Sequence, residues 1–369
     1  MATDATSSSP PAFTDGTPAC RNLTVRISYR WCRTCLAAHA SLGGEPMDVR
    51  ALGYVGIKSP NWKAWETWGP EIMGFGSGDP TPNVSAVTVE SEAQQAVYLR
   101  MDDRKWRLAV YPGEREGELA FVGWELADRI AFRDALVELK DKGVDFEVAT
   151  TEQAFERGVQ GMAWFFDPVG FRHEIFWSAY YFEDSFVPGR FPFKGFSTGR
   201  LGIGHVVLMV PELTDALDEF ALEVLGMRVF AGGTSIPLTG GDGGRVRTEM
   251  YRGRNNLRSH NLVYMEKEGY LGLHHMFIEY NHLDDMGRTY DLVQKKSDYP
   301  LIMTIGRHQA DTFLSFYCAT PSKFVFEVAW GSMELDDRSF VQDRPLHSFV
   351  WGLDMVGNII LDHLKINTE

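Results

Sequence analysis

The sequence predicts an α+β fold built by an internal repeat, and three observations support this prediction. A strand-like stretch at residues 52–57 resembles residues 203–208. Two helix-like stretches end in the similar segments 71–75 and 223–227. Short apolar runs alternate with helix-like segments in both halves. Because similar segments recur at a nearly constant spacing, we expect two homologous domains.

The second half shows the expected elements in order. Residues 205–210 form an apolar run typical of a buried strand, and residues 212–225 follow as an amphipathic helix. Residues 313–317 and 324–329 are predicted to be strands on either side of a turn at Pro321. A strand, a helix and several strands, repeated twice in each half, predict two βαβββ modules per domain.

The repeat also sets the expected domain boundaries. The spacing is 151 residues between Tyr54 and His205, and 153 residues between Glu174 and Glu327. We expect four segments: a disordered N-terminal extension at 1–46, an N-terminal repeat domain at 47–190, a C-terminal repeat domain at 191–335 and a tail at 336–369.

Composition and charge exclude several classes of protein. The 369 residues include 50 acidic and 36 basic side chains, a net charge of −14, and no block of Lys and Arg, so we expect no nucleic-acid partner. No apolar run approaches the roughly 18 residues that a membrane span needs. The N-terminus lacks the basic start and apolar core of a signal peptide, which predicts a cytoplasmic protein. Cys32 and Cys35 form a single C-x-x-C, which is only half of a zinc site.

Six of the ten histidines lie between His205 and His308. His205 stands in an apolar strand, where a half-polar ring must find partners, but the first half has Tyr54 at this position, so the scaffold does not require histidine. Glu327 stands in another apolar strand, where a carboxylate is paired, protonated or bound to a metal. Its counterpart Glu174 has no histidine partner in view, so an ion pair and metal ligation both stay open for Glu327.

The neighbouring residues His274 and His275 provide a third candidate ligand. Because side chains alternate across a strand, only one of the two can face a shared pocket, and periodicity does not say which. Two histidines and one carboxylate on separate strands would form the facial ligand set typical of non-haem Fe(II) enzymes. The residue types alone therefore support an iron site as a hypothesis.

One long stretch adds a family resemblance. Residues 306–321 (GRHQADTFLSFYCATP), together with Glu327, resemble the signature of the type I extradiol ring-cleavage dioxygenases, which belong to the vicinal oxygen chelate superfamily. The similarity covers almost everything from Met47 to about Trp330 and is greatest to two-domain enzymes that act on 2,3-dihydroxybiphenyl. It implies that residues 191–335 are the catalytic, metal-binding domain and that residues 47–190 have lost their metal site. It also implies cleavage of a catechol ring by O₂ with Fe(II), or less often Mn(II), in the degradation of aromatic compounds.

The resemblance also assigns roles to individual residues, and it alone selects His275 over His274. The family's roles fall on six positions: His205, His275 and Glu327 as metal ligands, His260 as the acid–base histidine, and His308 and Tyr317 as the pair that hydrogen-bonds substrate and oxygen.

Two residues depart from the family pattern. Ala310 stands where Asn is usual, which removes a polar contact near the site and affects substrate preference more than chemistry. Lys323 stands where Gly is usual, and a positive φ there would be costly. Aromatic residues at 177–182 and 191–196 suit a bulky substrate, so we expect a 2,3-dihydroxybiphenyl-like or polycyclic catechol. The resemblance also implies a homo-oligomer.

Two other functions stay open. A metal-chelate isomerase or lyase on this scaffold would need a fourth protein ligand or ligands from both halves, and Tyr54 argues against the second option. A non-catalytic protein that binds aromatic compounds would not need His260, His308 and Tyr317. Outside the candidate site, His282 and the two acidic residues that follow it at 284–285 are best explained as the start of a surface helix.

Overall fold

The computed structural model describes residues 46–80, 95–237, 245–335, 349–359 and 361–366. All of these residues belong to one compact unit that runs from Glu45 to Glu369. Residues 1–45 of the expected extension, which include Cys32 and Cys35, lie outside the described residues.

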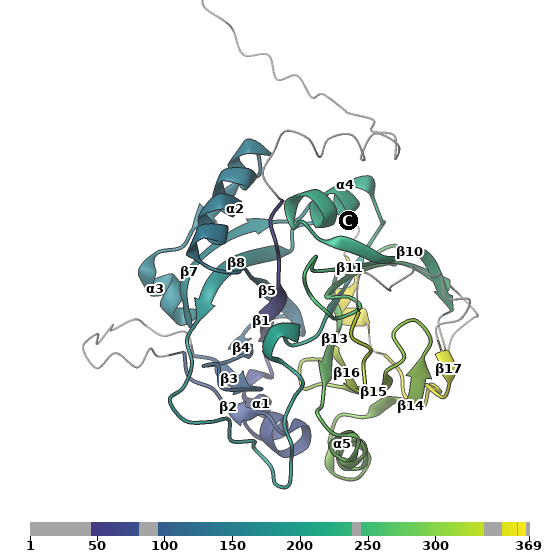
Figure 1. Ribbon diagram of the computed structural model, residues 1–369. Coiled ribbons are helices and arrows are strands. Elements are labelled where there is room, and N and C mark those ends of the chain that lie inside the picture. The colour runs from purple at the N-terminus through teal and green to yellow at the C-terminus, as the bar shows by residue number, and fades with distance from the viewer. Residues whose placement is uncertain (1–45, 81–94, 238–244, 336–348, 360, 367–369) are drawn as a thin grey trace, which may run out of the picture. The chain divides into compact units, whose positions relative to one another are not determined.

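Eight strands form the first mixed sheet, in the order β2-β3-β4-β1-β5-β8-β7-β6 (Figure 1). β1 is parallel to β4 and antiparallel to β5, and β5 is parallel to β8. The strands are β1 (Ala51–Ser59), β2 (Gly76–Ser77), β3 (Val97–Arg100), β4 (Leu108–Pro112), β5 (Glu118–Glu125), β6 (Phe146–Val148), β7 (Val159–Phe166) and β8 (Arg172–Ala179).

Nine strands form the second sheet, in the order β10-β11-β12-β9-β13-β16-β15-β14-β17. It repeats the pairing of the first sheet, since β9 is parallel to β12 and antiparallel to β13, and β13 is parallel to β16. β17, from the predicted tail, adds an outer strand. The strands are β9 (Val206–Val210), β10 (Arg228–Pro237), β11 (Arg245–Arg252), β12 (Leu262–Glu266), β13 (Gly272–Glu279), β14 (Leu301–His308), β15 (Leu314–Ala319), β16 (Val325–Trp330) and β17 (Phe349–Trp351).

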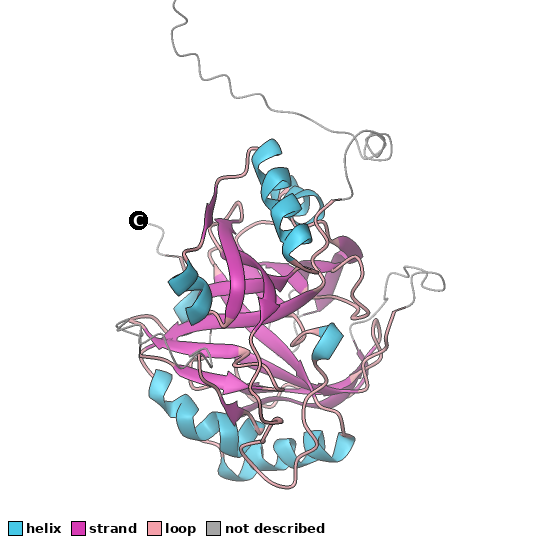
Figure 2. Cartoon of the chain, turned by 60° about the vertical axis from the view of Figure 1, so that its left-hand side comes forward, coloured by secondary structure: helices cyan, strands magenta, loops and turns pink. Residues whose placement is uncertain are grey.

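The strands follow one another in four groups: β1–β4, β5–β8, β9–β12 and β13–β16. In each group helical segments connect the first strand to the second, and the helices lie on the outer side of the sheets (Figure 2). The chain therefore contains four βαβββ modules, two in each sheet, which confirms the predicted α+β fold. The α-helices are α1 (Trp65–Trp68), α2 (Arg129–Asp141), α3 (Thr151–Glu156), α4 (Asp215–Glu219) and α5 (Leu283–Lys296). Shorter 3₁₀ and π segments are η1 (Trp62–Ala64), η2 (Gly69–Met73), η3 (Gly199–Leu201), η4 (Phe220–Val224) and η5 (Asp362–Leu364).

The largest buried apolar cluster contains residues from both halves of the chain. Trp65 stacks on Phe324 with 5.8 Å between ring centroids, and its Nε1 donates to Oγ of Ser322 over 2.8 Å. Tyr264 donates to Oδ2 of Asp167 over 2.9 Å. Because the halves share this buried interface, both sheets are held in one unit, and a domain boundary at residue 190 stays a prediction.

The structure shows how two positions singled out in the sequence are arranged, namely the start of α5 and the turn at Lys323. His282 is the N-cap of α5, and Asp284 and Asp285 lie in its first turn. Lys323 has a φ of 65°, so the turn between β15 and β16 does adopt the left-handed conformation that disfavours a side chain.

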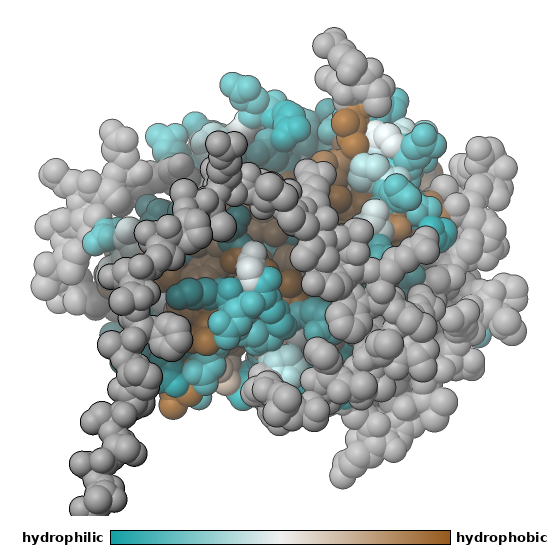
Figure 3. Space-filling model, turned by 90° about the horizontal axis from the view of Figure 1, so that it is seen from above, coloured by the Kyte–Doolittle hydropathy of each residue, from teal (hydrophilic) through white to brown (hydrophobic). Residues whose placement is uncertain are grey.

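Within the described ranges, no helix has the length and apolar character needed to cross a membrane. Figure 3 shows one face of the molecule, on which the described side chains form hydrophilic areas interrupted by smaller hydrophobic ones.

Candidate active site

The strands β9, β13 and β16 bring His205, His275 and Glu327 together. β13 lies between the other two strands, and His275 is paired in register with Val207 on one side and Val325 on the other. His205 directly precedes β9. One potential ligand atom from each of the three side chains lies within 4.8 Å of the other two, and all three residues are buried.

The distances between these atoms fit a metal ion. Oε2 of Glu327 lies 3.3 Å from Nε2 of His205 and 3.6 Å from Nε2 of His275. Nε2 of His205 is buried and makes no hydrogen bond to any described residue. A buried ring nitrogen that faces a carboxylate oxygen without bonding to it suits a cation held by both. Among the described residues, this is the only group of three or more potential His, Cys, Asp or Glu ligands.

Electrostatics favour the protonation states that bind metal. Burial lowers the pKa of His205 to about 4, so its imidazole is neutral near pH 7. Burial alone would raise the pKa of Glu327, but the charge of His308 and the close ring nitrogens of the surrounding histidines hold it well below its usual range. A neutral imidazole beside an ionised carboxylate is the combination that binds a divalent cation.

The structure also gives the neighbouring residues His274 and His275 different contacts. A β-bulge between Leu273 and His275 shifts the register of β13 against β9. Nε2 of His275 faces Glu327, whereas Nδ1 of His274 lies 2.7 Å from Nδ1 of His275. His275 therefore belongs to the group of three potential metal ligands, called the ligand group below, and His274 contacts the opposite edge of its ring.

The second oxygen of Glu327 contacts side chains from β14 and β15. Oε1 accepts hydrogen bonds from Tyr317 over 2.5 Å and from Ser315 over 2.9 Å, and it lies 2.9 Å from Nε2 of His308. The family resemblance assigned roles to His308 and Tyr317 but none to Ser315. The missed signal is alternation, because residues two apart on β15 face the same side of the sheet.

His260 completes the group of predicted residues. Its ring lies 4.1 Å from that of His205, at 30° between the ring planes, and 5.7 Å from that of Phe230. Burial, followed by electrostatic interaction with the adjacent titratable ring of His205, lowers its pKa well below the usual value. Its Nδ1 lies 3.0 Å from Oγ of Ser259 and 3.5 Å from Oδ2 of Asp311, two neighbours that the sequence pattern did not identify.

Comparisons with known proteins agree with this geometry. Residues 52–113 match the family described as dihydroxybiphenyl dioxygenase BphC D1. The biphenyl-2,3-diol 1,2-dioxygenase of Metapseudomonas furukawaii is 33% identical over 307 residues, which cover 83% of this chain and 94% of that protein. The iron-dependent extradiol dioxygenase of Rhodococcus jostii is 31% identical over 309 residues, which cover 84% and 98%. The chain belongs to the type I extradiol ring-cleavage dioxygenases.

Solved structures of extradiol dioxygenases share the fold. The crystal structure of BphC, a halotolerant catechol dioxygenase, is 32% identical in sequence, with a TM-score of 0.71 and coverage of 84% of this chain and 96% of that one. A crystal structure of a catechol 2,3-dioxygenase is 29% identical, with a TM-score of 0.73 and coverage of 85% and 99%. The fold of this dioxygenase is thus the vicinal oxygen chelate fold.

The first half of this extradiol dioxygenase has corresponding strands but different side chains. By strand register, Tyr54 corresponds to His205 and Phe121 to His275. Glu174 corresponds to Glu327. Tyr54 donates to Glu174 over 2.8 Å, while Arg157 and Arg172 form ion pairs with the same carboxylate at 3.0 and 2.8 Å. Two arginines therefore neutralise the buried charge in this half.

Proposed function

We propose that this extradiol dioxygenase cleaves a catechol ring beside its two hydroxyl groups, with O₂, at an Fe(II) centre held by His205, His275 and Glu327. The observation that carries the proposal is the convergence of two imidazole nitrogens and one carboxylate oxygen within 4.8 Å. This ligand set is typical of non-haem Fe(II) enzymes and leaves coordination positions open. The relative from Rhodococcus jostii is named as iron-dependent. When bound, Fe(II) supplies the one-electron chemistry that a catechol needs in order to react with O₂.

In this proposal, His260 takes a proton from a catechol hydroxyl as the substrate binds. Its lowered pKa leaves the ring neutral near pH 7, so it has a lone pair available to accept a proton. Its contact with the ring of His205 places it beside the ligand group. The same residue can return the proton later in the reaction.

His308 and Tyr317 act as hydrogen-bond donors toward substrate oxygens. Burial and the charge of Glu327 raise the pKa of Tyr317 well above its usual value, so the phenol keeps its proton. Burial would lower the pKa of His308, but Glu327 outweighs this effect and raises it. Donors that are positioned before reaction stabilise negative charge on oxygen, typically by a few kcal/mol.

An apolar cluster beside His260 supports a bulky aromatic substrate. Its buried members are Phe230, Ala231 and Leu335, and Met250, Ala310 and Met333 pack against them. Phe230 also stacks on the ring of His260, which links this cluster to the site. Relatives are named for biphenyl-2,3-diol and 1,2-dihydroxynaphthalene. We therefore infer a preference for 2,3-dihydroxybiphenyl-like or polycyclic catechols in aromatic degradation.

The test is to load the protein anaerobically with Fe(II), measure the bound iron, and admit air in the presence of a panel of catechols. A yellow ring-fission product with 2,3-dihydroxybiphenyl, and little with catechol itself, is the expected result. Colour with simple catechols alone would keep the reaction and overturn the substrate preference. No colour from protein that holds one iron per chain would overturn the reaction and favour an aromatic-binding protein.

A parallel sample loaded with Mn(II) distinguishes the two metals. We expect the higher turnover with Fe(II), and higher turnover with Mn(II) at equal occupancy would reverse the choice of metal. The homo-oligomer and the cytoplasmic location stay predictions, and light scattering on the purified chain tests the first.

A further inference from the structure

Three buried polar residues form a hydrogen-bonded cluster beside the ring of His205. Ser259, His260 and Asp311 are each no more than 7% exposed. Oγ of Ser259 lies 3.0 Å from Nδ1 of His260 and donates to Oδ2 of Asp311 over 3.0 Å. Ser259 therefore bridges the ring and the carboxylate from one side, since Nδ1 of His260 and Oδ2 of Asp311 themselves lie 3.5 Å apart.

The chemistry of these groups fixes the direction of both hydrogen bonds. An ionised carboxylate only accepts hydrogen bonds, so the single hydroxyl proton of Ser259 goes to Asp311. The Ser259 oxygen can then interact with Nδ1 of His260 only as an acceptor. Nδ1 must consequently carry the proton, and Nε2 keeps the free lone pair of the neutral ring.

We propose that Ser259 and Asp311 are positioning residues that hold His260 as the tautomer with its proton on Nδ1, so that Nε2 is the atom that receives the proton of the catechol. This inference rests on the proposed function. In the other tautomer the lone pair would lie on Nδ1 and face Ser259 and Asp311, where no substrate proton can reach it.

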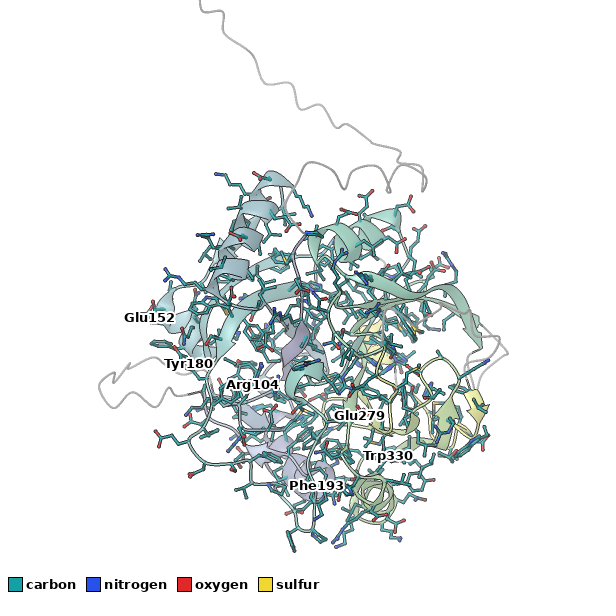
Figure 4. The ribbon with its side chains drawn as sticks, in the orientation of Figure 1. Arg104, Glu152, Tyr180, Phe193, Glu279 and Trp330 are labelled. Atoms are coloured by element: carbon teal, nitrogen blue, oxygen red, sulfur yellow. The ribbon has the colours of Figure 1, made fainter. Side chains whose placement is uncertain are left out.

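The surrounding backbone holds the three residues in place. Arg258, directly before Ser259, donates to Oε2 of Glu279 over 2.6 Å, and Glu279 is labelled in Figure 4 beside the strands of the second half. The backbone carbonyl of Asp311 accepts from the backbone N–H of Met333 over 3.2 Å. These contacts hold the backbone next to Ser259 and at Asp311 in place. The ring of His260 is therefore held by more than its stacking on neighbouring rings.

Thr312 gives independent support. It has a φ of 62°, a conformation that is uncommon for any residue with a side chain and an outlier for a β-branched one. Such strain persists only where surrounding contacts maintain it, and it is concentrated at functional sites. Here it lies between β14 and β15 and directly follows Asp311.

The experiment compares Ser259→Ala, Ser259→Thr and Asp311→Asn with the wild type, each as the full iron-loaded chain. The matched control is Ser322→Ala, because Ser322 is also buried and is hydrogen-bonded to Trp65, in the interface between the halves. The first readout is kcat/KM as a function of pH. The second is anaerobic titration with 2,3-dihydroxybiphenyl, in which the ultraviolet difference spectrum reports how much of the bound catechol is deprotonated.

We expect Ser259→Ala to lower kcat/KM roughly tenfold to hundredfold at unchanged iron content, as is typical when a supporting hydrogen bond is lost. The fraction of deprotonated catechol at a given pH should fall, and Asp311→Asn should shift both pH profiles. Ser259→Thr keeps the hydroxyl and should restore most of the activity, while Ser322→Ala should leave both readouts unchanged. The titratable groups that act on His260 in these profiles are His205, Glu327, His275, His308 and Asp311.

Wild-type pH profiles in both Ser259→Ala and Asp311→Asn, in folded and iron-loaded protein, would overturn the positioning role. Equal losses in Ser259→Thr and Ser259→Ala would overturn the positioning role of the Ser259 hydroxyl. These outcomes differ from failure of the proposed function, in which the wild type itself produces no ring-fission product from any catechol.

Discussion

Tyr317 donates its phenolic proton to Oε1 of Glu327 over 2.5 Å, on the carboxylate oxygen that does not face the histidine ligand candidates. The two oxygens of one carboxylate thus have separate partners. Oε2 faces His205 and His275. Oε1 accepts hydrogen bonds from side chains of β15 and lies close to His308 of β14. A single buried side chain therefore joins the proposed metal ligands to the residues proposed to contact the substrate.

Replacing Tyr317 with Phe tests this relationship. The variant should keep its iron, because Oε2 still faces both histidines, and should lose a donor that stabilises oxygen charge. We expect kcat to fall roughly a hundredfold to a thousandfold, as for a lost oxyanion donor. Steady-state kinetics with measured iron content checks the result. Tyr299→Phe is the matched control, since the Tyr299 hydroxyl bonds to exposed Asn61, and an equal loss there would contradict a specific role.

Glu327→Gln should weaken iron binding. It removes the only carboxylate of the ligand group, so bound Fe(II) would keep two neutral ligands and its full charge. We expect an iron affinity at least roughly a hundredfold lower, measured by competition with a chelator, with the fold retained by circular dichroism. Wild-type iron affinity in this variant would remove Glu327 from the ligand set.

The equivalent change in the first half, Glu174→Gln, should act on stability and not on iron. Arg157 and Arg172 would lose the charge that compensates them, and breaking a buried ion pair typically costs about 3–5 kcal/mol. Urea unfolding measures this loss, and iron content serves as the control. A loss of iron together with unchanged stability would place metal chemistry in the first half.

Metal removal should lower stability and abolish turnover together. Because Fe(II) binds the assembled site, free iron at about 100 times its Kd should stabilise the folded chain by about 2.7 kcal/mol. Thermal unfolding with and without a chelator, followed by addition of Fe(II), measures the effect. If activity returned with Fe(II) but the unfolding temperature did not change, iron would not be held by the buried ligand group.

Asp311 should make the free energy of unfolding of the metal-free chain depend on pH. Burial raises its pKa to about 6, so the folded chain holds this proton more tightly than the unfolded chain does. The stability that this carboxyl contributes is therefore present at low pH and is lost as the pH rises from about 4 to about 6, by about 3 kcal/mol in total.

Asp311→Asn does not titrate and should lack this loss. The difference between wild-type and variant free energies of unfolding should change across that pH window, measured by urea unfolding at several pH values. The facing groups His260, His308 and Glu327 are present in both proteins and serve as the common background. Parallel curves would show that the carboxyl titrates normally.

Ala310→Asn should change substrate preference more than reaction rate. Ala310 packs against the apolar cluster around Phe230, and an amide there would introduce a polar group beside that cluster. We expect the ratio of kcat/KM for 2,3-dihydroxybiphenyl to that for catechol to fall roughly tenfold, the effect of about 1.4 kcal/mol. An unchanged ratio would separate this cluster from substrate binding.

The sequence by itself determined the repeat, the α+β class and the residue types of the site. Strand periodicity and the near-constant spacing of similar segments can be recognised in the sequence without knowledge of the fold. His205 and Glu327 were identifiable because a polar residue in an apolar strand requires a partner. The choice of His275 needed the family resemblance, since alternation alone allows either neighbouring histidine.

Only the tertiary structure decided how these residues share their contacts. The bulge in β13, the division of Glu327 between two sets of partners, and the hydrogen-bonded cluster around Ser259 arise from pairing between strands that lie far apart in sequence. Local patterns carry no information on such register. The physical reason is that a hydrogen bond between distant side chains depends on which strands pair and in which register, and packing of the whole chain selects both.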